Sequence, residues 1–392
     1  MTERLYYTDP ALNQFEATVT RVDTVDGRQL VRLDRTAFYP TSGGQPFDVG
    51  TLGNARVTEV LDQEDEGDGD VIHVVEGVIS VGDKVAGRID WDRRFDHMQQ
   101  HTGQHVLSAA FDTLVKARTE SFHLGADYAT IDLARELSPA EIARAEDDAN
   151  RVVWEDRPVH IRFVDAAEAA SLPLRKTPAR EGTLRLIDVG GYDLSACGGT
   201  HVARSGAIGI IAVTGWERFK GGMRVGFVCG GRALRAHRRL RDVVTESARL
   251  LSTMQDELPA GIERLQADAK EARRQNKDLQ LTLAAHEADR LAAAAENGVV
   301  VAALDGWDQS ALKSIASAIA ARSGHVAALL GGPAPFAVVV ARSGDRATDC
   351  GAVLKGLAAR FGGKGGGRPE LAQGGGLQGD PREIADYLRS LL

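Results

Sequence analysis

Cysteine is scarce in this chain, whose 392 residues include only three, at positions 197, 229 and 350. Three widely spaced cysteines cannot form the disulfide framework of a small secreted protein, so we expect reduced thiols and a cytoplasmic location. Cys229 and Cys350 have no partner residue at a metal-ligand spacing, and we interpret both as packing residues. Cys197 differs from them because a histidine follows it four residues later.

Long apolar runs and an excess of positive charge are also absent. Residues 1–4 do not lead into an apolar segment, so we expect no signal peptide. The most apolar later stretch, 326–341, is interrupted by glycines and prolines, which predicts buried strands around a turn instead of a membrane span. The formal net charge of −8 argues against a uniformly basic coat for nucleic acid, although it allows local basic patches.

The composition that is present is that of a globular protein, with 43% hydrophobic and 26% charged residues. The length exceeds that of one ordinary hydrophobic core and suggests two to four domains. The residues that could carry chemistry are concentrated in two short motifs about ninety residues apart.

Two pairs of residues in these motifs have the spacing of metal ligands. His101 and His105 lie four residues apart in a stretch with a helical pattern, so their side chains share one helix face. Cys197 and His201 are also four apart, and the two glycines between them suggest a tight turn. Three imidazoles and one thiolate suit a tetrahedral site for one zinc ion. His97 falls on the same helical stripe and could replace either histidine of the first pair on spacing alone.

The two motifs together resemble a known family. His-Thr-Gly-Gln-His at 101–105, followed by Cys-Gly-Gly-Thr-His at 197–201, is similar to the editing domain of alanyl-tRNA synthetase and its free-standing AlaX relatives. In that family the histidines of the first motif and the cysteine and histidine of the second bind zinc. The resemblance therefore leaves His97 as a neighbour and implies zinc ligation by His101, His105, Cys197 and His201.

The pattern along the chain predicts an α+β multidomain protein. Residues 1–90 read as short strands with a hairpin signal at Asp26-Gly27, and they fit a small β-barrel. Residues 91–232 are expected to form an α+β editing domain with the zinc between a helix and a sheet. In that domain we expect the ligand helix to run through Leu114, a second helix capped by Ser138, and strands at 119–123, 129–133, 185–189, 208–213 and 224–228.

The last part of the chain predicts two further regions. Residues 233–297 have a long helical pattern with leucines at heptad multiples, which favours a helical arm, either a hairpin or a short coiled coil. Residues 298–392 alternate strands and helices and are expected to form an α/β domain. A homodimer, if one forms, is expected through the arm or through this C-terminal domain.

Several basic residues in these regions are candidate tRNA contacts. The arginines at the start of the arm, Arg235, Arg238 and Arg239, form either a solvated face or a basic patch for phosphates. The glycine-rich run at 362–368 could be a linker or a phosphate cradle, but it is not a Walker A loop, and ATP binding is not expected. The run resembles the C-terminal domain that alanyl-tRNA synthetase shares with DHH-type phosphoesterases, which implies phosphate contacts by Lys364 and Arg368. No Asp-His-His sequence is present, which disfavours phosphoesterase activity.

Two further substrate contacts are implied by the same resemblance. Residues 38–46 by themselves predict a Gly/Pro turn between strands. A similar segment precedes the zinc motifs in the family, so Gly43, Gly44 and Gln45 are expected to hold the tRNA acceptor end near the metal. The family also places a threonine in the strand after the ligand helix. This makes Thr119 the candidate contact for the misplaced amino acid, with Ser121 close enough to be confused with it.

The implied activity is that of a stand-alone, long-form editing hydrolase acting on tRNA(Ala). A synthetase would need an aminoacylation module ahead of the barrel, for which only about fifteen residues precede the first strand. The expected substrates are Ser-tRNA(Ala) and, second, Gly-tRNA(Ala). An apolar site rejects small isosteres weakly, whereas a hydrogen bond to the serine hydroxyl discriminates strongly against alanine. The zinc would either activate the ester or water, or only position the substrate.

No residue is marked by motif as the general base, and Asp193 merely lies near the second motif. Two alternatives are weighed against alanyl-tRNA editing. One is editing of threonyl-tRNA, where the related motif usually carries proline at the position of Thr200. The other is a non-catalytic tRNA-binding module with a structural zinc.

Overall fold

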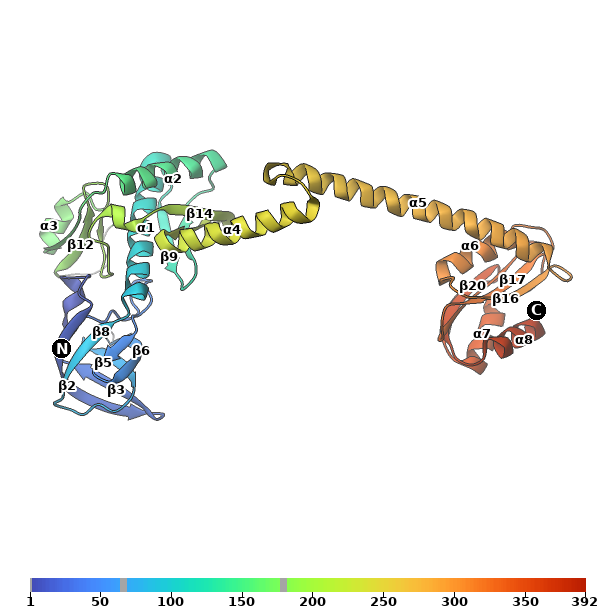
Figure 1. The fold of residues 1–392 in the computed structure, drawn as a ribbon, viewed down its shortest axis with the longest axis horizontal. Coiled ribbons are helices and arrows are strands. Elements are labelled where there is room, and N and C mark those ends of the chain that lie inside the picture. Colours follow the sequence, from blue (N-terminus) through green and yellow to red (C-terminus); the bar gives the residue numbers. More distant parts are fainter. Residues whose placement is uncertain (1, 64–68, 177–181) are drawn as a thin grey trace. The chain divides into compact units, whose positions relative to one another are not determined.

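The computed structural model describes residues 2–63, 69–176 and 182–392 and divides the chain into two compact units. Unit 1 is Met1–Thr245 and contains a closed β-barrel and an α+β part, whereas unit 2 is Glu246–Leu392 and contains a long helix and an α/β domain (Figure 1). The predicted α+β multidomain class is confirmed. None of the described helices is long and apolar enough to cross a membrane.

The barrel of unit 1 is formed by six strands that pair in the order β2-β3-β7-β6-β5-β8. Asp26 and Gly27 join the first two strands with positive φ angles of 52° and 78°, as a two-residue hairpin turn requires. The hairpin and the small barrel are therefore confirmed. The strands are β2 Gln14–Val25, β3 Arg28–Leu33, β5 Gly50–Leu52, β6 Ala55–Asp62, β7 Val71–Glu76 and β8 Lys84–Ile89, while β1 (Glu3–Arg4) and β4 (Arg35–Thr36) pair with each other.

His73 on β7 is fully buried in the barrel. Its Nε2 lies 2.8 Å from Thr36 Oγ1 and its Nδ1 lies 3.1 Å from the Val31 carbonyl oxygen. Burial lowers the pKa of His73 from 6.5 to about 4, since the charged imidazole loses its hydration, and the Val31 hydrogen bond opposes this only in part. His73 is thus a structural residue whose neutral form the folded barrel requires.

This lowered pKa predicts a specific pH dependence of stability. As pH falls from 6.5 to 4, the unfolded chain binds a proton at His73 before the folded chain does, so the free energy of unfolding decreases. Between pH 6.5 and 4, the free energy of unfolding of the wild type should fall by about 3 kcal/mol more than that of His73→Gln. Urea unfolding at a series of pH values measures this difference. The exposed His160→Gln is the matched control and should keep the wild-type slope. An unchanged slope in His73→Gln would contradict the prediction.

One long helix, α1 (Trp91–Val115), forms the centre of the α+β part. The Asp90 side chain caps it by accepting a hydrogen bond from the Arg93 amide, and Lys116 ends it with a φ of 53°. Every residue from His97 to Phe111 is buried. Since so many of these residues are polar, their side chains must find partners inside the protein.

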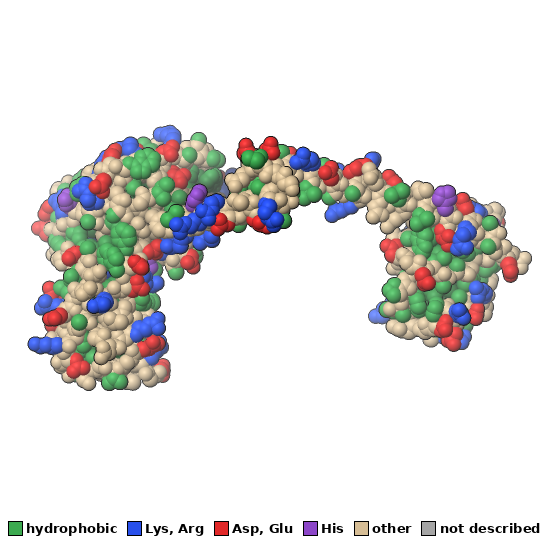
Figure 2. Space-filling view, in the orientation of Figure 1, with side chains coloured by type: hydrophobic (Ala, Val, Ile, Leu, Met, Phe, Trp, Pro, Cys, Tyr) green, Lys and Arg blue, Asp and Glu red, His purple; other side chains and the backbone are tan. Residues whose placement is uncertain are grey.

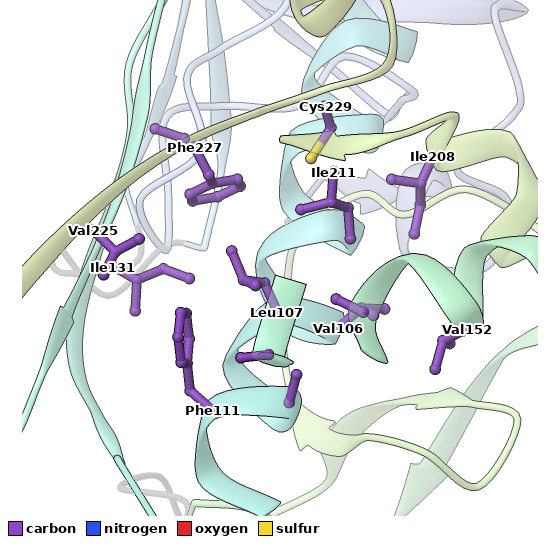
Figure 3. Close-up of a cluster of buried hydrophobic side chains, with 14 of the residues drawn as sticks. Val106, Leu107, Phe111, Ile131, Val152, Ile208, Ile211, Val225, Phe227 and Cys229 are labelled. Carbon is purple, nitrogen blue, oxygen red and sulfur yellow. The ribbon is translucent and has the colours of Figure 1, made fainter. Parts of the chain in front are cut away.

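Two antiparallel sheets and α2 complete the core around α1. One sheet has the order β14-β15-β10-β9 and the other β11-β12-β13. Leu107 and Phe111 of α1 pack with Ile131 and Phe227 of the first sheet, and Val152 of α2 belongs to the same cluster (Figure 3). The elements are β9 Thr119–Leu124, β10 Ala129–Leu133, α2 Pro139–Trp154, β11 Val159–Val164, α3 Ala166–Ser171, β12 Leu184–Val189, β13 Leu194–Ala196, β14 Ile211–Phe219 and β15 Gly222–Cys229.

The sequence predicted the start of α2 correctly and the start of β14 incorrectly. Ser138 caps α2 in a complete capping box with Glu141, as predicted. The strand predicted at 208–213 is wrong at its start, because Ile208 ends a 3-10 turn and β14 begins at Ile211. Between them, Gly209 has a φ of 84°, and a Cβ there would lie 2.9 Å from the Gly230 Cα, so this close approach of the two backbones favours glycine.

Two long helices follow this sheet, α4 (Gly230–Leu251) and α5 (Leu258–Ala293). The helical character predicted for this part of the chain is confirmed, and residues 252–257 separate the two α-helices. Pro259 lies in the first turn of α5, where its missing amide costs nothing, and therefore starts the helix instead of interrupting it. The heptad residues Leu265, Leu279 and Leu283 are exposed.

The C-terminal domain contains a five-stranded sheet in the order β16-β17-β18-β20-β19, with three helices. The apolar stretch at 326–341 forms two buried antiparallel strands, as expected. The glycine-rich run, by contrast, is a strand: Lys364–Arg368 pairs with Leu371–Leu377 in an antiparallel ladder. The elements are β16 Val299–Leu304, α6 Gln309–Ala320, β17 Val326–Gly331, β18 Phe336–Arg342, α7 Cys350–Phe361, β19 Lys364–Arg368, β20 Leu371–Leu377 and α8 Pro381–Leu391.

Candidate metal centre

Three histidines and one cysteine converge in the α+β part of unit 1. His101 and His105 lie one turn apart on α1, whereas Cys197 and His201 lie in the loop that follows β13. Their ligand atoms all lie within 4.8 Å of one another. Cys197 Sγ is 3.4 Å from Nε2 of His101 and 3.4 Å from Nε2 of His201. His97 is outside the cluster, which resolves the choice that spacing alone left open.

Each histidine of the cluster is held through its other ring nitrogen. These second contacts are His101 Nδ1 to Gln45 Oε1 at 2.8 Å, His105 Nδ1 to Asp193 Oδ2 at 2.8 Å, and His201 Nδ1 to Thr102 Oγ1 at 3.2 Å. With Nδ1 donating its proton to an oxygen, Nε2 keeps its lone pair for a cation. Three independent partners thus aim three imidazoles in the way that a metal centre requires.

Gln45 connects the barrel with both ligand motifs. Its Oε1 accepts hydrogen bonds from the His101 ring and from the Thr200 amide at 3.1 Å, and its Nε2 donates to Thr200 Oγ1 at 2.8 Å. The Gln45 side chain is completely buried. It therefore fixes the orientation of His101 relative to the loop that carries Cys197 and His201.

The loop around Cys197 is fixed by its own backbone. A Cβ on Gly199 would collide with the His101 ring, so only glycine fits there. The Gly199 amide donates to Cys197 Sγ at 3.4 Å. Arg185 Nη1 donates to the carbonyl oxygens of Cys197 at 2.6 Å and Gly199 at 2.9 Å. The tight turn expected from the two glycines thus presents the sulfur to the histidines.

The charges at the site favour a bound cation. Burial raises the pKa of the Cys197 thiol, but the His101 and His201 rings lower it by more, and the net pKa lies well below its usual value. Burial likewise raises the pKa of Asp193, but His105 and Arg175 hold it below its usual value. A thiolate facing three Nε2 atoms is the donor set of a tetrahedral zinc site, so these residues fit a metal ion.

Thr119, the candidate contact for the misplaced amino acid, and the nearby Ser121 have different hydrogen-bond partners in the structure. Thr119 is half-buried, and its hydroxyl donates to Ser108 Oγ on α1 at 2.9 Å. Ser121 donates to Asp132 of the neighbouring strand at 2.6 Å. The pairing of β9 with β10 shifts register between Asp132, which lies opposite Ser121, and Leu133, which lies opposite Thr119. The hydroxyls of Thr119 and Ser121 therefore have different surroundings. Thr119 is therefore the residue of the two that approaches the helix carrying the ligands.

The glycine segment of the barrel also approaches the metal cluster. Gly43 and Gly44 are exposed, with φ angles of 53° and 82°. A Cβ on Gly44 would lie 2.8 Å from the Phe122 ring, whose centroid is 6.0 Å from that of His101. Hence the exposed glycine backbone lies beside the site, while the Gln45 side chain is turned inward to orient the ligands.

The predicted basic contacts lie on exposed surface. Figure 2 shows Lys and Arg side chains gathered over the first part of α4, where Arg235, Arg238 and Arg239 are exposed. Arg232, at the start of this helix, is buried instead and forms an ion pair with Asp96 at 2.6 Å. In unit 2, Lys364 and Arg368 are exposed on β19.

Thr102, Asp193 and Arg185 contact the candidate ligands or the loop that carries them, and their contacts were not predicted from the sequence. Thr102 lies inside the first motif and Asp193 lies near the second, but neither motif assigns these residues a role. Arg185 carried no signal beyond its place in a strand. Among them, only Thr102 could have been found from sequence, because it lies within the ligand motif itself.

Models of three protein families match separate parts of this chain. The model described as tRNA synthetases class II (A) matches residues 3–93. The threonyl and alanyl tRNA synthetase second additional domain matches residues 184–225, which include the second ligand motif. The DHHA1 domain matches residues 296–392.

Whole-chain comparisons give similar relatives. The alanyl-tRNA editing protein AlaX-L of Pyrococcus horikoshii is 31% identical over 402 residues, covering 98% of this chain and 97% of that protein. Alanine–tRNA ligases of Methanoregula boonei and Methanoculleus marisnigri are 33% and 35% identical and match 98% and 96% of this chain. The chain spans only 42% and 41% of those ligases. A crystal structure of the C-Ala domain from Aquifex aeolicus alanyl-tRNA synthetase aligns with 24% of this chain and 89% of that domain, at 22% identity and a TM-score of 0.23.

Proposed function

Because this chain belongs to the AlaX-L family of alanyl-tRNA editing proteins, we propose that it is a zinc-dependent hydrolase that deacylates mischarged tRNA(Ala). The proposed main substrate is Ser-tRNA(Ala), with Gly-tRNA(Ala) as the second. The observation that carries the proposal is the cluster of one thiolate and three imidazoles, each imidazole aimed by its own partner.

The zinc would be held by His101, His105, Cys197 and His201, and when bound it would supply Lewis-acid polarisation of an ester or a bound water. The chain's own residues set the geometry around it. Gln45 and Asp193 keep two imidazoles in the tautomer that binds through Nε2. The exposed backbone at Gly43 and Gly44 offers close approach for the terminal ribose and ester beside the ligands.

Recognition of serine would begin with Thr119. Its half-buried hydroxyl is anchored on Ser108 and lies on the strand that also carries Phe122, beside His101. A hydroxyl in this place can hydrogen-bond the serine side chain, which an alanyl ester lacks. Because an alanyl ester cannot form this hydrogen bond, correctly charged Ala-tRNA(Ala) would bind more weakly and would escape hydrolysis.

Contacts to the tRNA itself are proposed at the exposed basic residues. Arg235, Arg238 and Arg239 on α4 and Lys364 and Arg368 on β19 present cations to phosphates. Because binding through phosphates releases counterions, tRNA affinity should fall as salt concentration rises.

The test is deacylation by the purified protein. The rates of deacylation of Ser-tRNA(Ala), Gly-tRNA(Ala) and Ala-tRNA(Ala) are compared. Thr-tRNA(Thr) and Ser-tRNA(Thr) are included to test the alternative of threonyl-tRNA editing. Rapid loss of serine with alanine spared is the expected result. Preferential hydrolysis of Ser-tRNA(Thr) would replace the alanine assignment by threonyl-tRNA editing. Tight tRNA binding without hydrolysis of any ester would make the protein a binding module.

Replacing the residue that orients His101 should weaken metal binding without removing a ligand. We expect Gln45→Leu to lower zinc affinity by about 10–100-fold, since the His101 tautomer and ring direction are no longer fixed. Affinity is measured by competition with a chelator of known strength. The matched control is Gln29→Leu, which removes hydrogen bonds to Ile79 elsewhere in the barrel. Equal zinc affinity of Gln45→Leu and wild type would show that Gln45 has no orienting role.

A further inference from the structure

Two buried polar atoms on α1 have no hydrogen-bond partner. Among the described residues, the buried side-chain atoms in this condition are His97 Nδ1, Gln104 Oε1 and Arg185 Nη2. Gln104 is 1% exposed and precedes the metal-binding residue His105 directly in sequence. A buried amide oxygen without a partner is costly, so its presence calls for a specific explanation, of which a functional role is one.

The position of Gln104 relates it to the site. Residues 101, 104 and 108 share one face of α1, because they are separated by three and four positions. Of the two flanking residues, His101 lies against Phe122 and Ser108 against Thr119, both on β9. Gln104 therefore faces β9 between these two contacts, next to the metal cluster and next to the proposed serine contact.

A chain of hydrogen bonds runs from Gln104 to Thr119. Gln104 Nε2 donates to Ser108 Oγ at 2.8 Å, and the Thr119 hydroxyl donates to the same oxygen at 2.9 Å. Ser108 is completely buried, whereas Thr119 is half-buried. The amide nitrogen of Gln104 is thus occupied and holds the side chain in place, while its oxygen is left as an acceptor.

We propose that Gln104 is a specificity-determining residue whose Oε1 accepts a hydrogen bond from the side-chain hydroxyl of a seryl ester held at the metal centre. The inference rests on the proposed function and deepens it. A seryl ester satisfies the unpaired oxygen, whereas an alanyl ester would place a methyl group against it and leave it unpaired. Thr119 forms the outer end of the same polar wall.

The experiment compares the zinc-loaded full chain with its Gln104→Met variant on Ser-tRNA(Ala) and Gly-tRNA(Ala). Methionine keeps the length of the side chain and removes both polar atoms. We expect kcat/KM for the seryl ester to fall by about tenfold or more, and that for the glycyl ester to change much less, since glycine has no hydroxyl. The melting temperature should be unchanged or higher, because an unsatisfied buried oxygen is removed.

Gln100→Met is the matched control on the same helix. Gln100 hydrogen-bonds the Cys229 backbone through both of its amide atoms, so its loss should lower the melting temperature and leave the serine-to-glycine ratio unchanged. Zinc content is measured in all three proteins. A binding readout uses non-hydrolysable 3′-amino-3′-deoxyadenosine amides of serine and glycine, for which Gln104→Met should lose only the preference for the seryl amide.

The outcomes distinguish failure of the inference about Gln104 from failure of the proposed function. Equal losses on both esters, or loss of zinc and of thermal stability in Gln104→Met, would make Gln104 a structural residue and overturn the inference alone. No hydrolysis of either ester by the zinc-loaded wild type would overturn the proposed function, and the inference with it.

Discussion

Replacing Cys197 by alanine is expected to lower kcat/KM for Ser-tRNA(Ala) by at least about a hundredfold, because the Lewis-acid contribution of a bound metal is worth several kcal/mol in the transition state. The variant removes the only thiolate of the donor set and leaves three imidazoles to hold the ion. Deacylation kinetics and zinc content measured on the same preparation should fall together. The loss should appear on the seryl and glycyl esters alike.

Cys350→Ala is the matched control for this prediction. Cys350 is a buried thiol at the start of α7 in unit 2, where it belongs to a separate apolar core. Its replacement should leave both zinc content and deacylation at wild-type values. If Cys197→Ala loses zinc but keeps its rate, the metal is structural. If it keeps both, Cys197 is required neither for zinc binding nor for deacylation.

The largest effect on stability is expected where α1 meets the barrel. Arg94 and Asp48 form an ion pair in which both side chains are completely buried. The Arg94 guanidinium also donates to the carbonyl oxygens of Pro10 and Ala37, and Asp48 accepts a hydrogen bond from the Tyr39 amide at 2.7 Å. We expect Asp48→Asn to lower the free energy of unfolding of unit 1 by about 3–5 kcal/mol, since it leaves the guanidinium buried without a counter-charge.

A double-mutant cycle tests the cause of this loss. In urea unfolding, Arg94→Met combined with Asp48→Asn should be more stable than the sum of the single changes predicts, because neither charge is then left unpaired. Glu246→Gln breaks an exposed ion pair with Arg249 and should leave the unfolding midpoint unchanged. Additive losses in the double mutant would show that packing, and not the unpaired charge, sets the cost.

Four candidate metal ligands and most of the local structure could be predicted from the sequence. Helix periodicity places His97, His101 and His105 on one face, and the resemblance to the editing family selected the last two as candidate ligands. The hairpin at Asp26-Gly27 and the cap at Ser138 were predictable because they depend on the backbone preferences of neighbouring residues. These features need no information from distant parts of the chain, and the resemblance to the editing family rested on the same short motifs.

The surroundings of the candidate ligands depend on contacts between distant parts of the chain. Gln45 and Thr200 are 155 residues apart, and His105 and Asp193 are 88 apart, so no local pattern pairs them. The same holds for the glycine run at 364–368, which becomes a strand because β20 supplies its hydrogen bonds and not because its residues favour one. Spacing along the chain and the resemblance to the editing family indicate the candidate ligands, whereas the orientation of their side chains follows from contacts that exist only once the barrel, α1 and the two sheets have packed together.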